Sequence, residues 1–362
     1  AALRADGVFD LSAHFSTMSQ LLDEADPAAS VAAAAGRRVG SLDELLAHSV
    51  AAAGEAPRDP AHARLLAPCD LQVLKAAGVT FATSLIERVI EEHAGGDAAQ
   101  AAAARAQVLA VVGDDLAAIV PGSPAAMALK QLLIGQGMWS QYLEVGIGPD
   151  AEVFTKAPVL SAVGTGADIG ILAASVWNNP EPEVVLAVSS QGRIVGATLG
   201  NDVNLRDIEG RSALLLSKAK DNNASCAIGP FIRLFDSTFD LDDVRQETVH
   251  LHVQGPEGYE LRGINSMARI SRDPLDLVAQ TVAAHQYPDG FMLFLGTLFA
   301  PIEDRDQPGG GFTHKLGDEV SIRSSRLGEL RNRVTHSERA APWRFGIRAL
   351  IENLATRGLL RT

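Results

Sequence analysis

The chain has 362 residues, 47% of them hydrophobic, which is enough for one large core or for two domains. Lysine and arginine number 31 against 44 aspartates and glutamates, and the net charge of -13 disfavours the phosphate backbone of nucleic acid as a partner. Two cysteines are too few for a disulfide framework, no charged-then-apolar leader opens the chain, and no apolar run approaches the roughly 20 residues that span a bilayer. We therefore expect a cytoplasmic protein with no membrane segment and no nucleic-acid partner.

Three regions follow one another along the chain. Residues 1–66 alternate short strand-like pieces with a capped helix at 41–46 and end in a polar, proline-containing linker, which predicts a small N-terminal domain. From about residue 84 to 142 the sequence is alanine-rich, with apolar residues spaced near 3.6, and this pattern predicts a helical insertion. The insertion belongs to a second domain, 67–362, whose part after Asp150 is predicted to be mainly β because β-branched runs alternate with turn residues.

Two helices are predicted within this mainly β part. One runs from about Asp207 to Lys220 with Asn204 as its N-cap, and the other runs from Pro274 to Ala284. No internal repeat of roughly 20 to 50 residues is visible, so a solenoid or propeller is not expected.

Three carboxylates flank a predicted β-hairpin. Glu181 and Glu183 stand two residues apart at the start of an apolar strand, so their side chains share a face, and Asp202 follows the returning strand. Like charges this close repel strongly unless a cation neutralises them. Oxygen ligands without an accompanying histidine or cysteine favour Mg²⁺ or Mn²⁺ over zinc. The alternative interpretation of the Glu-x-Glu pair is a solvated acidic strand end.

The turn of this hairpin predicts the pairing of its strands. Residues 189–192 read as the loop, so Val188 is expected to face Arg193 and Glu183 to face Thr198. Asp202 would then lie on the same face as the two glutamates.

An ordered set of polar motifs resembles the fumarylacetoacetate hydrolase superfamily. In chain order the motifs are Glu181-x-Glu183, residues 201–207, Lys220, residues 226–230, Gly296-Thr297 and residues 315–318. The ordered set is far more specific than any single motif, and the resemblance covers about residues 66 to 360. It implies an α+β fold with the mixed β-roll of that family.

The resemblance also implies roles for individual residues. The residues that it places at an Mg²⁺ ion, with Mn²⁺ as an alternative, are Glu181, Glu183 and Asp202. The residues that it places at the substrate are Arg206, Asn223 and Thr297. The catalytic candidates are Lys220, Glu87 and Ser84.

One departure from the family pattern indicates the reaction. Hydrolytic members carry a histidine and a glutamate one helical turn apart that together activate water, whereas here Ser84 replaces the histidine and Glu87 remains. Together with Glu209 and Asn223, the helical insertion and the stretches 177–180, 218–223 and 285–290, this departure resembles the branch that dehydrates 2-keto-3-deoxy-pentonates. The resemblance implies a lyase of oxidative pentose catabolism. The reaction would convert 2-keto-3-deoxy-D-xylonate to 2,5-dioxopentanoate through a metal-stabilised enolate.

Two assignments of the proton transfers stay open. In the first, Lys220 removes the C3 proton, its pKa lowered by burial or by a nearby cation, and Glu87 protonates the departing hydroxyl. In the second, Glu87 is the base and Lys220 acts as an electrostatic clamp. The sequence does not decide between them.

Two other functions are alternatives. One is a hydrolase that cleaves a C–C bond in an acylpyruvate or 2,4-diketo acid, which Ser84 disfavours. The other is a non-catalytic sugar-acid-binding protein, which the retention of a costly anionic cluster disfavours. The resemblance further implies a homodimer or homotetramer.

Three other motifs are interpreted as structural. His250-Leu251-His252 has strand spacing but no third ligand, so a polar strand face is expected. The glycines of 164–170 lack the spacing of a dinucleotide fingerprint and are expected in turns. Cys226 has no histidine close to it in sequence and is expected to be a buried structural thiol.

Overall fold

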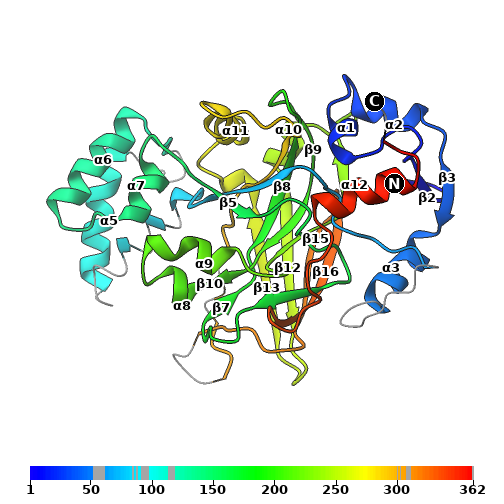
Figure 1. The fold of residues 1–362 in the computed structure, drawn as a ribbon. Coiled ribbons are helices and arrows are strands. Elements are labelled where there is room, and N and C mark those ends of the chain that lie inside the picture. Colours follow the sequence, from blue (N-terminus) through cyan, green and yellow to red (C-terminus); the bar gives the residue numbers. More distant parts are fainter. Residues whose placement is uncertain are drawn as a thin grey trace.

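A computed structural model describes most of the chain, and its fold is shown in Figure 1. The described residues are 1–51, 62–83, 85–86, 89–90, 98–112, 119–299, 301, 303–306 and 311–360. Ser84 and Glu87, two of the implied catalytic residues, lie outside them.

The larger sheet carries most of the buried apolar runs. Its strands, in spatial order, are β11 (Cys226–Leu234), β9 (Ile194–Asp202), β8 (Pro182–Val188), β14 (Phe291–Phe294), β4 (Val73–Gly78) and β5 (Glu152–Ala157). β14 and β4 pair in parallel, and the other neighbours are antiparallel. Every residue of β8 is buried, because both faces of the sheet are covered there.

The smaller sheet packs on one face of the larger sheet. Its strands, in spatial order, are β13 (Glu260–Ser266), β12 (Thr248–Gln254), β15 (Glu319–Ser324), β16 (Gly328–His336) and β6 (Asp168–Ile171). Val184 and Leu186 of β8 lie in the same apolar core as Leu251 and Val253 of β12. Burial alternates along β12 and β13, so the other face of this sheet is exposed.

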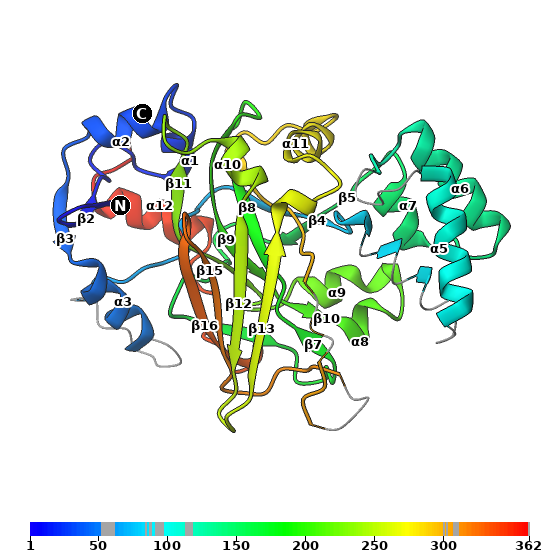
Figure 2. The same cartoon turned by 180° about the vertical axis from the view of Figure 1, so that it is seen from behind.

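The N-terminal region forms a small sheet with three helices. These elements are β1 (Ala2–Arg4), β2 (Gly7–Asp10), β3 (Arg37–Gly40), α1 (Met18–Leu22), α2 (Pro27–Ala33) and α3 (Leu42–Ala51). The last helix of the chain, α12 (Ile347–Thr356), lies beside this region in both views of the fold (Figures 1 and 2). Leu22 is buried with Leu74 of the larger sheet, so the region also packs on the main body. The domain boundary at residue 66 stays a prediction.

The described part of the predicted insertion is helical. It contains α5 (Ala98–Val112), α6 (Pro124–Gly135) and α7 (Gln141–Ile147), and the hydroxyls of Ser123 and Ser140 cap the last two. Buried side chains of these helices, among them Val108 and Leu129, form an apolar cluster of their own. Figures 1 and 2 show that the insertion and the N-terminal region lie on opposite sides of the two sheets.

The remaining elements are short. They are β7 (Asn178–Asn179), β10 (Asn204–Leu205), α8 (Arg206–Glu209), η2 (Ala213–Leu215), α9 (Leu216–Lys220), α10 (Leu241–Arg245), η3 (Met267–Arg269) and α11 (Pro274–Val282). Within the described residues, no helix combines the length and the apolar character needed to cross a lipid bilayer.

The prediction of one helix from Asp207 to Lys220 is wrong. The segment folds as two short α-helices with a 3₁₀ turn between them, because the Ser212 hydroxyl accepts a hydrogen bond from the Leu214 N–H and starts a new turn. Asn204 lies in β10 and does not cap a helix. The second predicted helix is confirmed with a slightly earlier end.

The structural interpretation of the histidines and of Cys226 is confirmed, and that of the glycines is confirmed in part. His250 and His252 point to the exposed face of β12. Gly166 lies in a turn with a φ of 83°, which favours glycine. Gly170 lies within the buried strand β6, so the prediction of a turn is wrong for it. Cys226 is buried, and burial raises the pKa of its thiol to about 12, so it stays protonated.

Candidate metal and active site

The hairpin β8–β9 brings the three carboxylates together on one face. Glu183 pairs with Gly200, two residues beyond the predicted partner. The predicted register is wrong because Val188 pairs with Ile194, and an irregularity next to this pair shifts the register by one more residue. A shift by two residues keeps every side chain on its face, so the prediction of a shared face survives.

The carboxylates form a compact, buried cluster. One oxygen from each of Glu181, Glu183 and Asp202 lies within 4.8 Å of the other two. Glu183 and Asp202 are each only 2% exposed, and Glu181 is half-buried. The alternative interpretation as a solvated strand end is therefore wrong. Oxygen donors alone fit a hard divalent cation such as Mg²⁺ or Mn²⁺.

The charges of the cluster also fit a cation. Burial raises the pKa of Glu181 to about 7, although the ammonium of Lys220 acts in the opposite direction. Burial, together with the negative charges of Asp202 and Glu181, raises the pKa of Glu183 well above its usual range. A bound divalent cation would offset this repulsion and stabilise the ionised carboxylates.

Lys220 contacts two of the three carboxylates. Its Nζ lies 2.6 Å from Oε2 of Glu181 and 3.2 Å from Oδ2 of Asp202, and the residue is 4% exposed. Burial alone would lower the pKa of Lys220, but the two carboxylates outweigh it and raise the pKa well above its usual value. The expectation of a lowered pKa is therefore wrong, and the two carboxylates favour the charged form of Lys220.

A second buried lysine, which sequence reasoning missed, lies on the other side of Asp202. The Nζ of Lys156 is 2.9 Å from Oδ1 of Asp202, and the residue is fully buried. The same group donates hydrogen bonds to the backbone carbonyls of Val203 and Lys220. Burial alone would raise the pKa of Asp202, but Lys156 and Lys220 together lower it.

Asn204 joins the cluster to a further carboxylate. Its Nδ2 donates to Oε1 of Glu181 at 3.0 Å and to Oε2 of Glu209 at 2.6 Å. Glu152, at the start of β5, is half-buried, and burial together with the charge of Glu209 raises its pKa. Sequence reasoning missed Glu152.

Two of the predicted substrate residues lie on segments next to the carboxylates. The backbone N–H of Gly296 donates to Oε2 of Glu183 at 2.6 Å, and Thr297 follows it in the chain. Arg206 starts α8 directly after β10, donates to the carbonyl of Pro301 at 3.0 Å and stacks over the ring of Trp177. Their contact with substrate stays a prediction.

The third predicted substrate residue is directed elsewhere. The amide of Asn223 donates to the carbonyls of Ser337 and Ala341, each at 3.2 Å, and so ties its loop to the C-terminal segment. Ser84 and Glu87 lie outside the described residues, and their roles also stay predictions.

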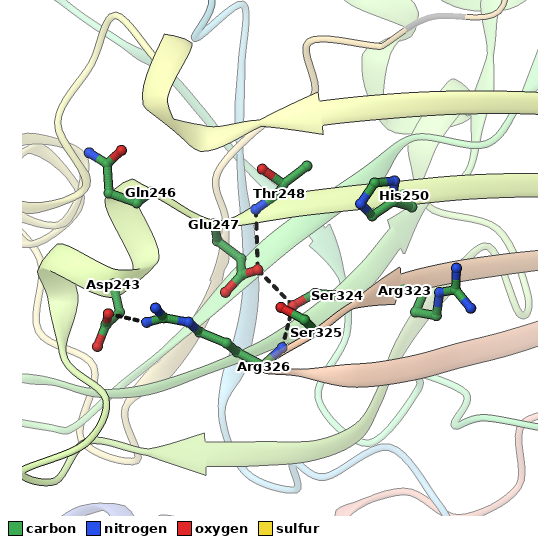
Figure 3. A pocket seen from close by; sticks show the side chains of 9 residues that line it. All are labelled: Asp243, Gln246, Glu247, Thr248, His250, Arg323, Ser324, Ser325 and Arg326. Carbon is green, nitrogen blue, oxygen red and sulfur yellow. Dashed lines mark hydrogen bonds and ion pairs between the residues drawn. The ribbon is translucent and has the colours of Figure 1, made fainter.

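A separate cavity of about 560 Å³ opens beside the smaller sheet (Figure 3). Its lining residues are Asp243, Gln246, Glu247, Thr248, His250, Arg323, Ser324, Ser325 and Arg326. None of the predicted site residues is among these described lining residues. The carboxylates, in contrast, lie on the larger sheet, on the face that Val185 and Ala187 share by strand alternation.

Comparison with known families matches residues 149–335 to a family described as fumarylacetoacetate (FAA) hydrolase C-terminal. This range is more than half of the chain and includes all three carboxylates, Lys156 and Lys220.

Two curated proteins are similar in sequence. One, from Haloferax volcanii, is named probable 2-keto-3-deoxyxylonate dehydratase and is 31% identical over 198 residues, which cover 55% of this chain. The other, from Saccharolobus solfataricus, is named 2-dehydro-3-deoxy-D-arabinonate dehydratase and is 30% identical over 182 residues, which cover 49% of this chain. The matched parts span 65% and 57% of the lengths of these relatives.

Solved structures of 2-keto-3-deoxy-D-arabinonate dehydratase share the fold. The apo form is 20% identical with a TM-score of 0.58 and covers 84% of this chain and 83% of its own. The complex with magnesium and 2,5-dioxopentanoate is 22% identical with a TM-score of 0.59 and covers 87% of this chain and 90% of its own. These likenesses confirm the predicted α+β fold. Together with the family match over residues 149–335, they show that the chain belongs to the fumarylacetoacetate hydrolase family.

Proposed function

We propose that the protein is a Mg²⁺-dependent hydro-lyase that converts 2-keto-3-deoxy-D-xylonate, or a related 2-keto-3-deoxy-pentonate, to 2,5-dioxopentanoate. The observation that carries this proposal is the buried triad with the Lys220 ammonium in contact with two of its carboxylates. The dehydratase names of both curated relatives support it. So does the complex of a protein with the same fold, which contains magnesium and 2,5-dioxopentanoate.

The metal ion would be held by Glu181, Glu183 and Asp202, whose oxygen donors and unfavourable mutual repulsion fit a hard cation. When bound, Mg²⁺ supplies stabilisation of the negative charge that develops on the keto oxygen of the substrate. Glu183 and Asp202 are buried, and a charge interaction is stronger in such a site than in water.

Dehydration requires two proton movements on the substrate. A proton leaves C3, and the hydroxyl on C4 leaves as water after it receives a proton. Further proton shifts carry the double bond to the C5 carbon, and the resulting enol becomes the aldehyde. The site must therefore provide a base and an acid, and the substrate loses one molecule of water in total.

The charge state of Lys220 supports its role as an electrostatic clamp. Because Glu181 and Asp202 keep it protonated, Lys220 is suited to stabilise a developing negative charge on the substrate. This favours Glu87 as the base at C3, the second of the two assignments from sequence. Glu152, a half-buried carboxyl whose pKa burial raises, is then the candidate acid for the departing hydroxyl.

Product identification tests the proposal. The purified protein is incubated with Mg²⁺ and a panel of 2-keto-3-deoxy acids that differ in chain length and in C4 configuration, and with an acylpyruvate. We expect an aldehyde product from a pentonate and none from the acylpyruvate. Cleavage of the acylpyruvate to two carboxylic acids would instead identify the hydrolase alternative, and tight sugar-acid binding without turnover would identify the binding protein.

A homodimer or homotetramer in the cytoplasm is also part of the proposal, as closed symmetric assembly is common among soluble enzymes. Light scattering over a range of protein concentrations tests the assembly. A mass that stays at the 38.1 kDa of one chain at every concentration would contradict it.

A further inference from the structure

Lys156 holds one oxygen of Asp202. Its Nζ lies 2.9 Å from Oδ1, while Oδ2 faces Lys220 at 3.2 Å. Lys156 is fully buried, so no water competes for its ammonium, and its bonds to the carbonyls of Val203 and Lys220 fix the position of that group. Oδ1 is therefore paired by charge with a buried ammonium, and Oδ2 is the oxygen that faces the second lysine.

Strand geometry explains why Lys156 reaches this position. In the pairing of β4 with β5, Leu74 pairs with Ala157 and Lys75 with Thr155, so Lys156 has no partner on β4. An extra residue of this kind bends the strand and redirects its side chain, a device found next to active sites. At the bulge the alternation of β5 is broken, so the neighbours Lys156 and Ala157 are both buried, and the ammonium of Lys156 reaches Asp202.

The two glutamates show the same arrangement. The backbone N–H of Gly296 donates to Oε2 of Glu183, and the amide of Asn204 donates to Oε1 of Glu181. The other oxygen of Glu181 contacts Lys220. The other oxygen of Glu183 has no hydrogen-bond donor among the residues that the structure describes. Each carboxylate of the triad is thus held at one oxygen by a group that a metal ion does not replace.

We propose that Lys156, together with Asn204 and the Gly296 N–H, makes the triad selective for Mg²⁺ over Ca²⁺ by limiting each carboxylate to a single metal-ligating oxygen. Mg²⁺ demands near-octahedral geometry with about six ligands, whereas Ca²⁺ takes roughly six to eight and often binds both oxygens of one carboxylate. Hydrogen-bond donors that occupy the second oxygen therefore weaken the binding of Ca²⁺ more than the binding of Mg²⁺. This inference rests on the proposed magnesium site.

Calorimetric titration of the substrate-free protein with Mg²⁺ and with Ca²⁺ tests the selectivity. Lys156→Met frees Oδ1 of Asp202. It also removes a positive charge, and this loss strengthens the attraction of the site for both ions alike. The ratio of the two Kd values is therefore the readout. Asn204→Leu frees Oε1 of Glu181 without changing any charge. In the control, Lys130→Met removes a lysine whose partner is Glu144 in the helical insertion.

We expect the ratio of the Kd for Ca²⁺ to the Kd for Mg²⁺ to fall by about tenfold or more in Lys156→Met and in Asn204→Leu. Loss of a group that holds a metal ligand commonly changes metal affinity by this much. The ratio should stay unchanged in Lys130→Met. If Lys156→Met does not fold, Asn204→Leu decides alone. An unchanged ratio in the folded variants, with Mg²⁺ still bound, overturns the inference only. A wild-type protein that binds neither ion at millimolar concentration overturns the metal site itself and the inference with it.

Discussion

The ammonium of Lys220 lies 2.6 Å from Oε2 of Glu181, so a predicted catalytic residue forms an ion pair with a predicted metal ligand. This pair supplies positive charge to a half-buried carboxylate that lies beside two others. A divalent cation at the triad offers the same compensation. Metal binding and the Lys220 contact therefore compete for the same oxygen, and this competition can be measured.

Substitution of Lys220 should separate metal binding from turnover. Lys220→Met removes the competing ammonium, so we expect Mg²⁺ to bind at least as tightly as in the wild-type protein while kcat falls by about 10² or more. The exposed neighbour Lys218, changed to methionine, is the matched control. Calorimetry and a product assay provide the two readouts. Weaker Mg²⁺ binding together with unchanged kcat would contradict this account of Lys220.

Each carboxylate of the triad should be needed for metal binding. Glu181→Gln, Glu183→Gln and Asp202→Asn each neutralise one oxygen ligand, so we expect weaker Mg²⁺ binding and loss of most activity. Glu260→Gln on the exposed face of the smaller sheet is the control and should leave both unchanged. Unaltered affinity and turnover in all three triad variants would rule out this metal site.

The pair of glutamates could be predicted because its spacing is local, whereas the position of Lys156 and the direction of the pKa shift of Lys220 could not. Glu181 and Glu183 share a face in any strand, and the two-residue register error left that face unchanged. The inward position of Lys156 depends on a bulge against β4, a tertiary feature without a sequence signature. The raised pKa of Lys220 likewise follows from contacts between segments far apart in the chain.

The interruption between α8 and α9 was missed for a different reason. Helical spacing continues through residues 207–220, but the local hydrogen bond of the Ser212 hydroxyl competes with the helix and wins. The amide of Asn204, predicted as a cap for this helix, instead links Glu181 and Glu209. A polar residue before a helical pattern can thus either cap the helix or bond side chains of other segments, and only the fold distinguishes these two roles.

Glu87 can be tested although it lies outside the described residues. If it is the base at C3, Glu87→Gln should abolish both the exchange of the C3 hydrogens with deuterated water and product formation, with metal affinity nearly constant. NMR follows the exchange, and an aldehyde assay follows the product. Exchange that persists without product would make Glu87 the acid for the hydroxyl instead, and full retention of both would remove it from the mechanism.

A buried histidine should make the fold sensitive to acid. Burial is the main cause that lowers the pKa of His314 below 6.5, and its Nδ1 lies 3.0 Å from Oδ2 of Asp318. The folded state therefore binds a proton at His314 less readily than the unfolded state does. The contribution of neutral His314 to the free energy of unfolding is complete above about pH 6.5, and it declines as the pH falls towards the pKa in the folded state. His314→Leu removes this titration, and Arg305 still holds Asp318 at 2.7 Å.

Denaturant unfolding of wild type and His314→Leu at several pH values from about 7 to 5 checks this prediction. The free energy of unfolding should fall with decreasing pH more steeply in the wild-type protein than in the variant. Parallel curves for the two proteins would show that His314 does not contribute to the acid sensitivity.

The central claim is a Mg²⁺-dependent loss of water, and ¹³C NMR of one reaction tests it most directly. Labelled 2-keto-3-deoxy-D-xylonate is followed with the protein and Mg²⁺, and again after the metal is removed with a chelator. The account predicts the aldehyde carbon of 2,5-dioxopentanoate in the first reaction, no conversion in the second, and recovery when Mg²⁺ is restored. Equal conversion in the presence and absence of metal, or a product in which a C–C bond is cleaved, would contradict it.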